Sequence, residues 1–231
     1  MPLADGLDLR TGPGARLWVR RGLEEPEGGA WEAWLAEGEA RLQRSAAERV
    51  GTGRGDARRV RIGARSGVWR VNRHGGLLGG LLDQRHASPA RLQQEIELSE
   101  QLRARGLPTP AVLLGLALRD GLFWRQHLVT EEIAGARTVF EARNDPGALA
   151  AAGALLQRLF DAGLWATDLH PGNLLWQPDT RSCSVIDLAG ARLLGRPLRS
   201  RERAARLARF RRFFAKHAGS DVHDPSRIPQ V

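Results

Sequence analysis

The pattern of apolar and polar positions in the first half of the chain predicts two β-hairpins. Residues 58–63 and 67–73 alternate on either side of a short turn, and two further apolar-rich runs, residues 111–118 and 122–133, flank "RDG" and predict a second hairpin. Successive side chains of a strand point to opposite faces of a sheet, so alternation is typical of strands with one buried face. A further short strand is expected over residues 16–22.

A period of three to four residues predicts helices elsewhere. It runs through three segments, residues 30–50, 88–106 and 145–163. The second has the clearest boundaries: Ser88 is placed to cap it, Pro89 occupies its first position and Gly106 follows its end. After residue 145, only the short runs "NLLW" and "CSVIDL" favour strands.

The order of these elements predicts the fold class. Strands dominate the first half of the chain and helices the second, which is typical of α+β proteins, where sheet and helices are segregated. We therefore expect a two-lobed α+β fold. Its parts are an N-terminal extension (residues 1–45), a small β-rich N-lobe (46–132) and a compact, mostly helical C-lobe that ends in a basic helix (133–231).

Composition limits the class of protein. A hydrophobic fraction of 42%, with seven Trp and six Phe among 231 residues, is sufficient for a packed core. The single cysteine, Cys183, excludes a disulfide within the chain and favours a reducing compartment. The first ten residues lack the apolar region of a signal peptide, and the longest apolar runs are shorter than the roughly 20 residues of a membrane-spanning helix.

The net charge of +9 narrows the choice of partner. Lys216 is the one lysine among 35 basic residues, so nearly all of the positive charge is arginine. Guanidinium groups bind phosphate through two parallel hydrogen bonds, which suits a phosphate-bearing partner. A GC-rich genome also explains the preference for arginine, and the net charge is compatible with nucleic acid, a membrane surface or an anionic substrate.

Two motifs carry the candidate chemistry, "ATDLHPGNLLW" at residues 166–176 and "SVIDLAGA" at residues 184–191. Transfer of a phosphoryl group needs a carboxylate near the attacking hydroxyl and oxygen ligands for Mg²⁺. Asp168 and Asn173 lie five residues apart on a Pro-Gly loop, and Asp187 follows a short apolar run. Aspartate and asparagine also serve turns, but turns alone do not explain all three residues at this spacing.

These motifs resemble those of the lipopolysaccharide core kinases, in particular the 3-deoxy-D-manno-octulosonic acid (Kdo) kinase family. The resemblance begins near Gly53 and rests on the stretches "GRG" (53–55), "RHGGLLG" (73–79), "EIELSEQLRARGLPTP" (95–110), "RDGLFWRQHLVTEEIAGART" (119–138), "DLHPGN" and "VIDLAGARL". It implies a protein-kinase-like fold that uses ATP and Mg²⁺ and takes a lipopolysaccharide precursor as acceptor. It also implies a cytoplasmic monomer, peripheral on the inner face of the inner membrane.

The resemblance also implies a role for each candidate residue. Asp168 is the expected catalytic base, and Asn173 and Asp187 are the expected metal ligands. The expected nucleotide-binding residues are Gly53, Gly55, Arg70, Glu95 and Glu131. The backbone of Glu131 would pass the adenine at the hinge between the lobes.

The sequence departs from the kinase pattern at three places. Arg70 stands where kinases have a strand lysine, and this half of the chain contains no lysine. Ala166 and Thr167 replace the His and Arg of the His-Arg-Asp motif. Leu188 and Ala189 replace the Phe-Gly that follows the metal-binding aspartate. An arginine can hold both a carboxylate and a phosphate, so the resemblance still implies activity.

Helical position predicts a partner for Arg70. Glu95 falls in the inward stripe of the helix expected over residues 88–106, together with Leu92 and Ile96. A buried carboxylate is costly unless it is paired, so we expect Glu95 to face a cation, and the resemblance implies Arg70. One alternative is a chance placement of Glu95 at the edge of the stripe. Another is an Arg70 side chain that points to solvent, because alternation does not say which face of "GVWRV" is inward.

The segment 196–217 predicts a basic amphipathic helix. Leu207, Phe210 and Phe214 share one face, and arginines occupy much of the remainder. Such a helix packs on the C-lobe with a solvated charged face, and the same face is also suited to rest against anionic lipid.

With the resemblance, the sequence predicts ATP-dependent phosphorylation of a sugar hydroxyl, that of Kdo, on a lipopolysaccharide or lipid A precursor. One alternative is a kinase of the same fold that acts on a soluble small molecule or protein. Another is a pseudokinase that binds an anionic partner, which the missing lysine and His-Arg pair favour. Retention of Asp168, Asn173 and Asp187 opposes the pseudokinase, and nucleic acid is not an expected partner.

Overall fold

The computed structural model describes four stretches of the chain, residues 6–24, 30–50, 57–73 and 84–217. The chain divides into two compact units. Unit 1 contains residues 1–101 and 111–132, and unit 2 contains residues 102–110 and 133–231. The later boundary, after residue 132, is also the one predicted between the two lobes.

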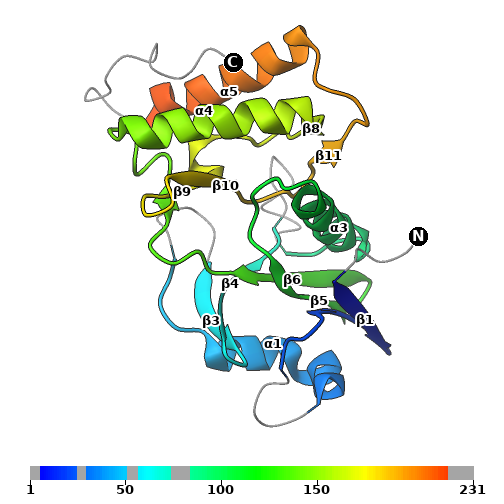
Figure 1. Cartoon of the computed structure of the whole chain (residues 1–231). Helices are drawn as coiled ribbons and strands as arrows, with labels where there is room; N and C mark the ends of the chain where they lie inside the picture. Colours follow the sequence, from blue (N-terminus) through cyan, green and yellow to red (C-terminus); the bar gives the residue numbers. More distant parts are fainter. Residues whose placement is uncertain (1–5, 25–29, 51–56, 74–83, 218–231) are drawn as a thin grey trace. The chain divides into compact units, whose positions relative to one another are not determined.

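A six-stranded antiparallel sheet forms the centre of unit 1 (Figure 1). The strands are β1 (Leu7–Gly12), β2 (Ala15–Arg20), β3 (Arg58–Ile62), β4 (Arg65–Val71), β5 (Val112–Asp120) and β6 (Phe123–Glu131). Their spatial order is β1-β2-β5-β6-β4-β3. The two predicted hairpins, β3–β4 and β5–β6, are confirmed, and β6 joins them by pairing with both β5 and β4.

Helices cover both faces of this sheet: the 3-10 turn η1 (Trp31–Ala33), α1 (Trp34–Ser45) and α3 (Ala90–Ala104). On one face, Trp31, Trp34 and Leu42 are buried in a cluster with residues of five of the strands. On the opposite face, Leu92 and Ile96 of α3 are buried in a second cluster with β2, β5 and β6. Figure 1 shows α1 and α3 on the two sides of the sheet of unit 1.

The structure differs from the expectation for residues 1–45. β1, which the pattern does not predict, pairs with β2, and α1 packs on the sheet, so residues 7–45 join unit 1 instead of forming a separate extension. β1 is an edge strand of which only Leu7 is buried, so it lacks the alternation of a half-buried strand. α1 ends at Ser45 and not at residue 50, because the following residues run beside β3, where the Ala47 N–H donates to the Arg59 carbonyl.

A glycine lets α3 approach the sheet closely. A Cβ atom at Gly115 of β5 would lie 2.5 Å from Cδ1 of Ile96, which is too close for two carbon atoms. The Ile96 side chain therefore occupies the space over the glycine. This close approach brings the neighbouring residue of α3, Glu95, within reach of β4.

Unit 2 combines small antiparallel sheets with the long helices α4 and α5. Its elements are β7 (Arg137–Thr138), α4 (Pro146–Asp161), β8 (Leu164–Trp165), η2 (Pro171–Asn173), β9 (Leu174–Gln177), β10 (Ser182–Val185), β11 (Arg192–Leu193) and α5 (Ser200–His217). One sheet has the order β10-β9-β7, and β11 pairs with β8. The predicted helices near residues 145–163 and 196–217 are confirmed. In the described part of the chain, no helix is both long and apolar enough to cross a bilayer.

The start of α4 is fixed by a side-chain cap. A carboxylate oxygen of Asp145 accepts hydrogen bonds from the N–H groups of Gly147 (2.9 Å) and Ala148 (3.3 Å), and Pro146 takes the first helical position. The apolar side of α4 packs on β9 and β10. That packing supports the hairpin whose open end carries Asn173 and Asp187.

Candidate active site

The two residues of unit 1 that were predicted to pair are paired. Arg70 on β4 donates a hydrogen bond through Nη2 to Oε1 of Glu95 on α3. The Glu95 side chain is 3% exposed and that of Arg70 is 25% exposed. Leu128 lies opposite Arg70 on β6 and belongs to the cluster under α3, so the Arg70 side chain is on the α3 face of the sheet.

Two buried amides that were not predicted extend this pair. Asn72 follows Arg70 by two residues and therefore lies on the same face of the sheet. Its Oδ1 accepts a hydrogen bond from Arg70 Nη1 (2.7 Å), and its Nδ2 lies 3.4 Å from Glu95 Oε2 and 3.3 Å from Gln126 Oε1. Polar groups that are buried and hydrogen-bonded to one another have few alternative rotamers, so the network orients the Arg70 guanidinium.

For the other residues predicted to bind the nucleotide, Gly53, Gly55 and Glu131, the structure gives less support. Gly53 and Gly55 lie outside the described residues. Glu131 is the last residue of β6, and its N–H donates to the carbonyl of Ala111 at 2.8 Å. A contact between the Glu131 backbone and adenine is therefore restricted to its carbonyl oxygen. The Glu131 carboxylate lies 3.5 Å from Arg65 in an exposed ion pair.

In unit 2, the loop between β8 and β9 holds Asp168 and Asn173. The Asn173 amide donates through Nδ2 to the carbonyl oxygen of Asp168 at 2.9 Å, which closes the loop. His170 caps η2, because its Nδ1 accepts the N–H of Gly172 at 3.1 Å, and Pro171 takes the first position. The side chain of Asp168 is 51% exposed, so it is accessible to a substrate.

The β9–β10 hairpin brings Asn173 next to Asp187. Leu174 pairs with Val185, and the N–H of Ile186 donates to the carbonyl of Asn173 at 2.9 Å, so Asp187 follows directly. The φ angle of Asp187 is +57°, in the left-handed region that few residues other than glycine adopt. Aspartate adopts this conformation more readily than most residues, and backbone of this kind recurs at functional sites, where the surrounding structure maintains it.

The side-chain oxygens of Asn173 and Asp187 are suited to bind a magnesium ion whose other ligands come from a nucleotide and water. Nδ2 of Asn173 donates to the backbone carbonyl of Asp168, which leaves the side-chain oxygen of Asn173, Oδ1, for a metal, and the Asp187 side chain is exposed. Within the described stretches, no group of three or more His, Cys, Asp or Glu side chains could enclose a metal ion. Mg²⁺ is usually held by one or two protein oxygens together with water and substrate phosphates, so two donors are sufficient.

Helix α5 contributes contacts to this loop that sequence reasoning did not predict. Arg209 donates through Nη2 to Oδ1 of Asp168. Phe213 stacks on the ring of His170, with centroids 4.2 Å apart and an interplanar angle of 8°. The sequence shows many arginines in this helix but not which of them meets the loop, because that depends on how α5 packs.

His170 connects these groups. Burial lowers the pKa of His170, while the charge of Asp168 acts in the opposite direction. The ring is therefore neutral at neutral pH, and since Nδ1 accepts a hydrogen bond, the proton is on Nε2. Nε2 lies 3.9 Å from Oδ1 of Asp168. His170 thus presents an N–H group toward the carboxylate.

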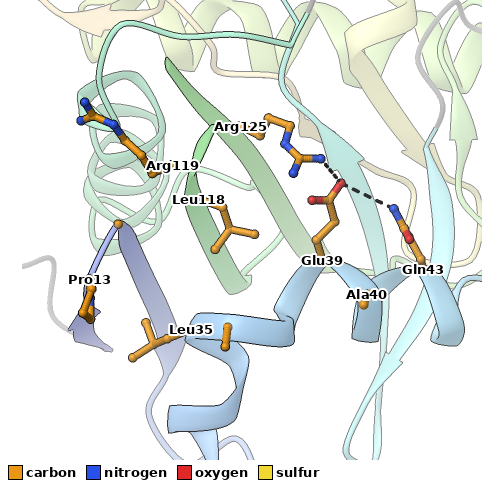
Figure 2. Close-up of a pocket in the computed structure, with 10 residues that line it drawn as sticks. Pro13, Leu35, Glu39, Ala40, Gln43, Leu118, Arg119 and Arg125 are labelled. Carbon is orange, nitrogen blue, oxygen red and sulfur yellow. Dashed lines mark hydrogen bonds and ion pairs between the residues drawn. The ribbon is translucent and has the colours of Figure 1, made fainter. Parts of the chain in front are cut away.

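A hollow of about 480 Å³ in unit 1 lies apart from these residues (Figure 2). It is lined by α1 and by parts of β5 and β6, and its carboxylate, Glu39, is already bound by Arg125 at 2.7 Å and Gln43 at 3.5 Å. α1 covers the face of the sheet opposite to α3, whereas the Arg70–Glu95 pair is on the α3 face. None of the predicted site residues that the structure describes lines this hollow.

A sequence model of the lipopolysaccharide kinase (Kdo/WaaP) family matches residues 33–224. The chain belongs to this family. The resemblance seen in the motifs is thereby confirmed, and the match contains all the predicted site residues, from Gly53 to Asp187. The match begins at residue 33 and therefore includes α1, which was expected to lie outside the resemblance.

Two relatives in this family are named 3-deoxy-D-manno-octulosonic acid kinase. The one from Vibrio vulnificus (strain YJ016) is 31% identical over 132 residues, covering 54% of this chain and 56% of the relative. The one from Xanthomonas axonopodis pv. citri (strain 306) is 31% identical over 138 residues, covering 52% and 55%. The chain thus spans about half the length of the curated relatives it matches.

Solved structures confirm the predicted fold class. The structure described as "WaaP in complex with acyl carrier protein" has a TM-score of 0.56 at 19% identity, covering 92% of this chain and 86% of its own. The Rio2 kinase–ADP/Mg²⁺–phosphoaspartate complex from Chaetomium thermophilum has a TM-score of 0.52 at 19% identity, covering 84% and 63%. This chain therefore has an α+β, protein-kinase-like fold.

Proposed function

We propose that this chain transfers the γ-phosphate of ATP to a sugar hydroxyl of a lipopolysaccharide precursor. The observation that supports this most directly is the arrangement in unit 2. The Asn173 side chain is bound to the backbone of Asp168, and Asp187 follows the hairpin partner of Asn173. A base and two oxygen donors for a metal therefore lie on one connected piece of backbone, which is what phosphoryl transfer requires.

In the proposed reaction, Asp168 receives the proton of the acceptor hydroxyl. The hydroxyl oxygen forms a bond to the γ-phosphorus, the bond from phosphorus to the bridging oxygen breaks, and ADP leaves. Asn173 and Asp187 would hold Mg²⁺, which supplies positive charge to the phosphates when bound. Because the transition state is loose, the main contribution of Asp168 is to orient the hydroxyl.

Arg70 and Glu95 are proposed to bind the nucleotide phosphates. A guanidinium has five N–H donors in a planar fork, so one arginine can hold a carboxylate and a phosphate together. The pairing with Glu95 and Asn72 gives Arg70 a defined orientation. This arrangement supports an active enzyme in which arginine replaces the strand lysine, and it speaks against the pseudokinase alternative.

The proposed acceptor is Kdo on a lipid-linked precursor. The name of the relatives supports Kdo, and the net charge of +9 suits an anionic acceptor. The exposed face of α5 carries Arg201, Arg212 and Lys216, on the side away from its buried residues. We propose that these three side chains contact anionic lipid on the inner face of the inner membrane.

A direct assay tests this function. Purified protein with ATP, Mg²⁺ and a Kdo-bearing lipid A precursor should release ADP and give a product heavier by one phosphate, as measured by mass spectrometry. The same precursor without Kdo should remain unmodified. Phosphorylation of soluble sugars only would favour the soluble-substrate kinase. Binding of Mg·ATP without ADP release for any acceptor would favour the pseudokinase.

A further inference from the structure

Three arginines of α5, spaced three residues apart, contact the chain around the Asp168 loop. In order along the helix, the contacts are Arg203 with the Asp161 carboxylate (2.7 Å), Arg206 with the Ala166 carbonyl (3.2 Å) and Arg209 with the Asp168 carboxylate. A spacing of three residues keeps the side chains near one face of a helix. The partners follow in the same order along the chain, so α5 runs alongside the segment that ends in the Asp168 loop.

The helix does not depend on Arg209 for its attachment. Leu207, Phe210 and Phe214 are buried beneath it, and the Arg206 guanidinium lies 4.4 Å from the centroid of the Trp165 ring. The side chains of Arg209 and Asp168 are 45% and 51% exposed. An ion pair this exposed contributes little to stability. The main effect of the Arg209 contact is therefore on the orientation of the Asp168 side chain, and not on the stability of the fold.

Arg209 restricts the orientation of the carboxylate. In the described part of the chain, the Arg209 guanidinium and Nε2 of the neutral His170 ring, 3.9 Å away, both approach the same oxygen of Asp168, Oδ1. A carboxylate held by one oxygen presents the other, Oδ2, in a fixed direction. Phe213 stacks on His170 at the same time, so α5 holds the loop at two points.

The residues before Asp168 do not supply such support. Ala166 has no polar side-chain group, and Thr167 is exposed. We propose that Arg209 is a positioning residue for Asp168, which it holds in the orientation needed to receive the acceptor proton. This inference rests on the proposed function. Small displacements of a catalytic group have large effects on rate, so a contact that is weak for stability can matter for turnover.

The test compares Arg209→Met with Arg211→Met, which removes the same charge from the same helix at an exposed position away from the loop. We expect Arg209→Met to lower kcat about tenfold with KM for ATP unchanged, while Arg211→Met keeps the wild-type kcat. Arg209→Lys keeps the charge and should recover part of the loss. Asp168→Asn/Arg209→Met should be no slower than Asp168→Asn, because Arg209 acts through the carboxylate.

Three results would overturn the inference. One is an unchanged kcat in Arg209→Met, which would leave an ordinary surface ion pair. Another is a higher KM for the acceptor with unchanged kcat, which would make Arg209 an acceptor-binding residue. The third is a further loss of rate when Arg209→Met is added to Asp168→Asn.

Hydrogen exchange separates this inference from the proposed function. The amides of residues 166–173 should exchange faster in Arg209→Met than in Arg211→Met, whether or not the protein transfers phosphate. Equal exchange in the two variants would contradict the positioning role. If the wild type shows no transfer while the loop is still ordered by Arg209, the proposed function fails and the structural role of Arg209 stands.

Discussion

Two of the carboxylates predicted from the sequence, Glu95 and Asp168, occupy opposite environments. Glu95 lies in unit 1, is 3% exposed and is fixed by Arg70 and Asn72. Asp168 lies on a loop of unit 2, is 51% exposed and is paired with Arg209. A buried carboxylate without its cation would be a large cost to folding, whereas an exposed one is solvated by water. We therefore expect the first pair to matter for stability as well as for the proposed nucleotide binding, and the second to matter mainly for the proposed reaction.

The largest expected effect is on catalysis by Asp168. Asp168→Asn keeps the shape of the side chain and removes the proposed base, so kcat should fall by at least about 10²-fold, with nucleotide affinity nearly unchanged. The free energy of unfolding should change by less than about 1 kcal/mol, because the side chain is exposed. Steady-state kinetics and denaturant unfolding measure the two quantities. A loss of stability as large as that of an Arg70 variant would abolish the contrast between the two carboxylates.

In unit 1, Arg70→Met should affect stability and activity together. It leaves the buried Glu95 carboxylate without its cation, and we expect a loss of about 3 kcal/mol in the free energy of unfolding and a higher KM for ATP. Glu95→Gln should cost less, because an amide still accepts a hydrogen bond. The double variant should be little worse than Arg70→Met. Arg61→Met, at an exposed position of the neighbouring strand, is the control. Additive effects of the two single changes would argue against a functional pair.

A buried histidine of unit 1 should give stability a pH dependence. His127 is 0% exposed, and burial, with a further contribution from Arg125, lowers its pKa to about 4. In the unfolded chain the pKa is near 6.5, so as the pH falls below 6.5 the unfolded chain gains a proton that the folded protein does not. The free energy of unfolding should therefore be lower by about 2 kcal/mol at pH 5 because of His127.

Denaturant unfolding at pH 7.5 and pH 5 checks this in wild type and His127→Gln. Carboxylates titrate in both proteins, so the difference between the two isolates His127. The decrease in stability should be smaller in the variant. Equal decreases would mean that the histidine is protonated in the folded protein as easily as in the unfolded chain.

The smallest expected effect is the loss of metal-dependent stabilisation in unit 2. Mg·ATP at about ten times its Kd should stabilise the wild type by about 1.4 kcal/mol, and Asp187→Ala should lose the part that depends on Mg²⁺. Asp179→Ala, at the closed end of the same hairpin, is the control and should behave as the wild type. A thermal-shift measurement with and without Mg²⁺ distinguishes them. An equal Mg²⁺-dependent shift in Asp187→Ala would remove Asp187 as a ligand.

The sequence predicts local features well and distant contacts only in part. Apolar runs separated by short turns predict both hairpins of unit 1, and the helical stripe predicts that Glu95 faces inward, because these patterns reflect backbone geometry. β1 escapes prediction because an edge strand with one buried residue has no alternation. Asn72 could have been suspected, since it follows Arg70 by two residues on the same face. Gln126 and Arg209 carry no such local signal.

By itself, the sequence determined the fold class and the residue types of the candidate site. The spacing of Asp168, Asn173 and Asp187 is short, so loop and hairpin geometry alone place them together. The tertiary structure decided which cation meets each carboxylate. Arg70 reaches Glu95 because Gly115 lets α3 approach the sheet, and Arg209 reaches Asp168 because α5 packs its aromatic face on unit 2. An arginine-rich sequence offers many equivalent cations, and only packing distinguishes among them.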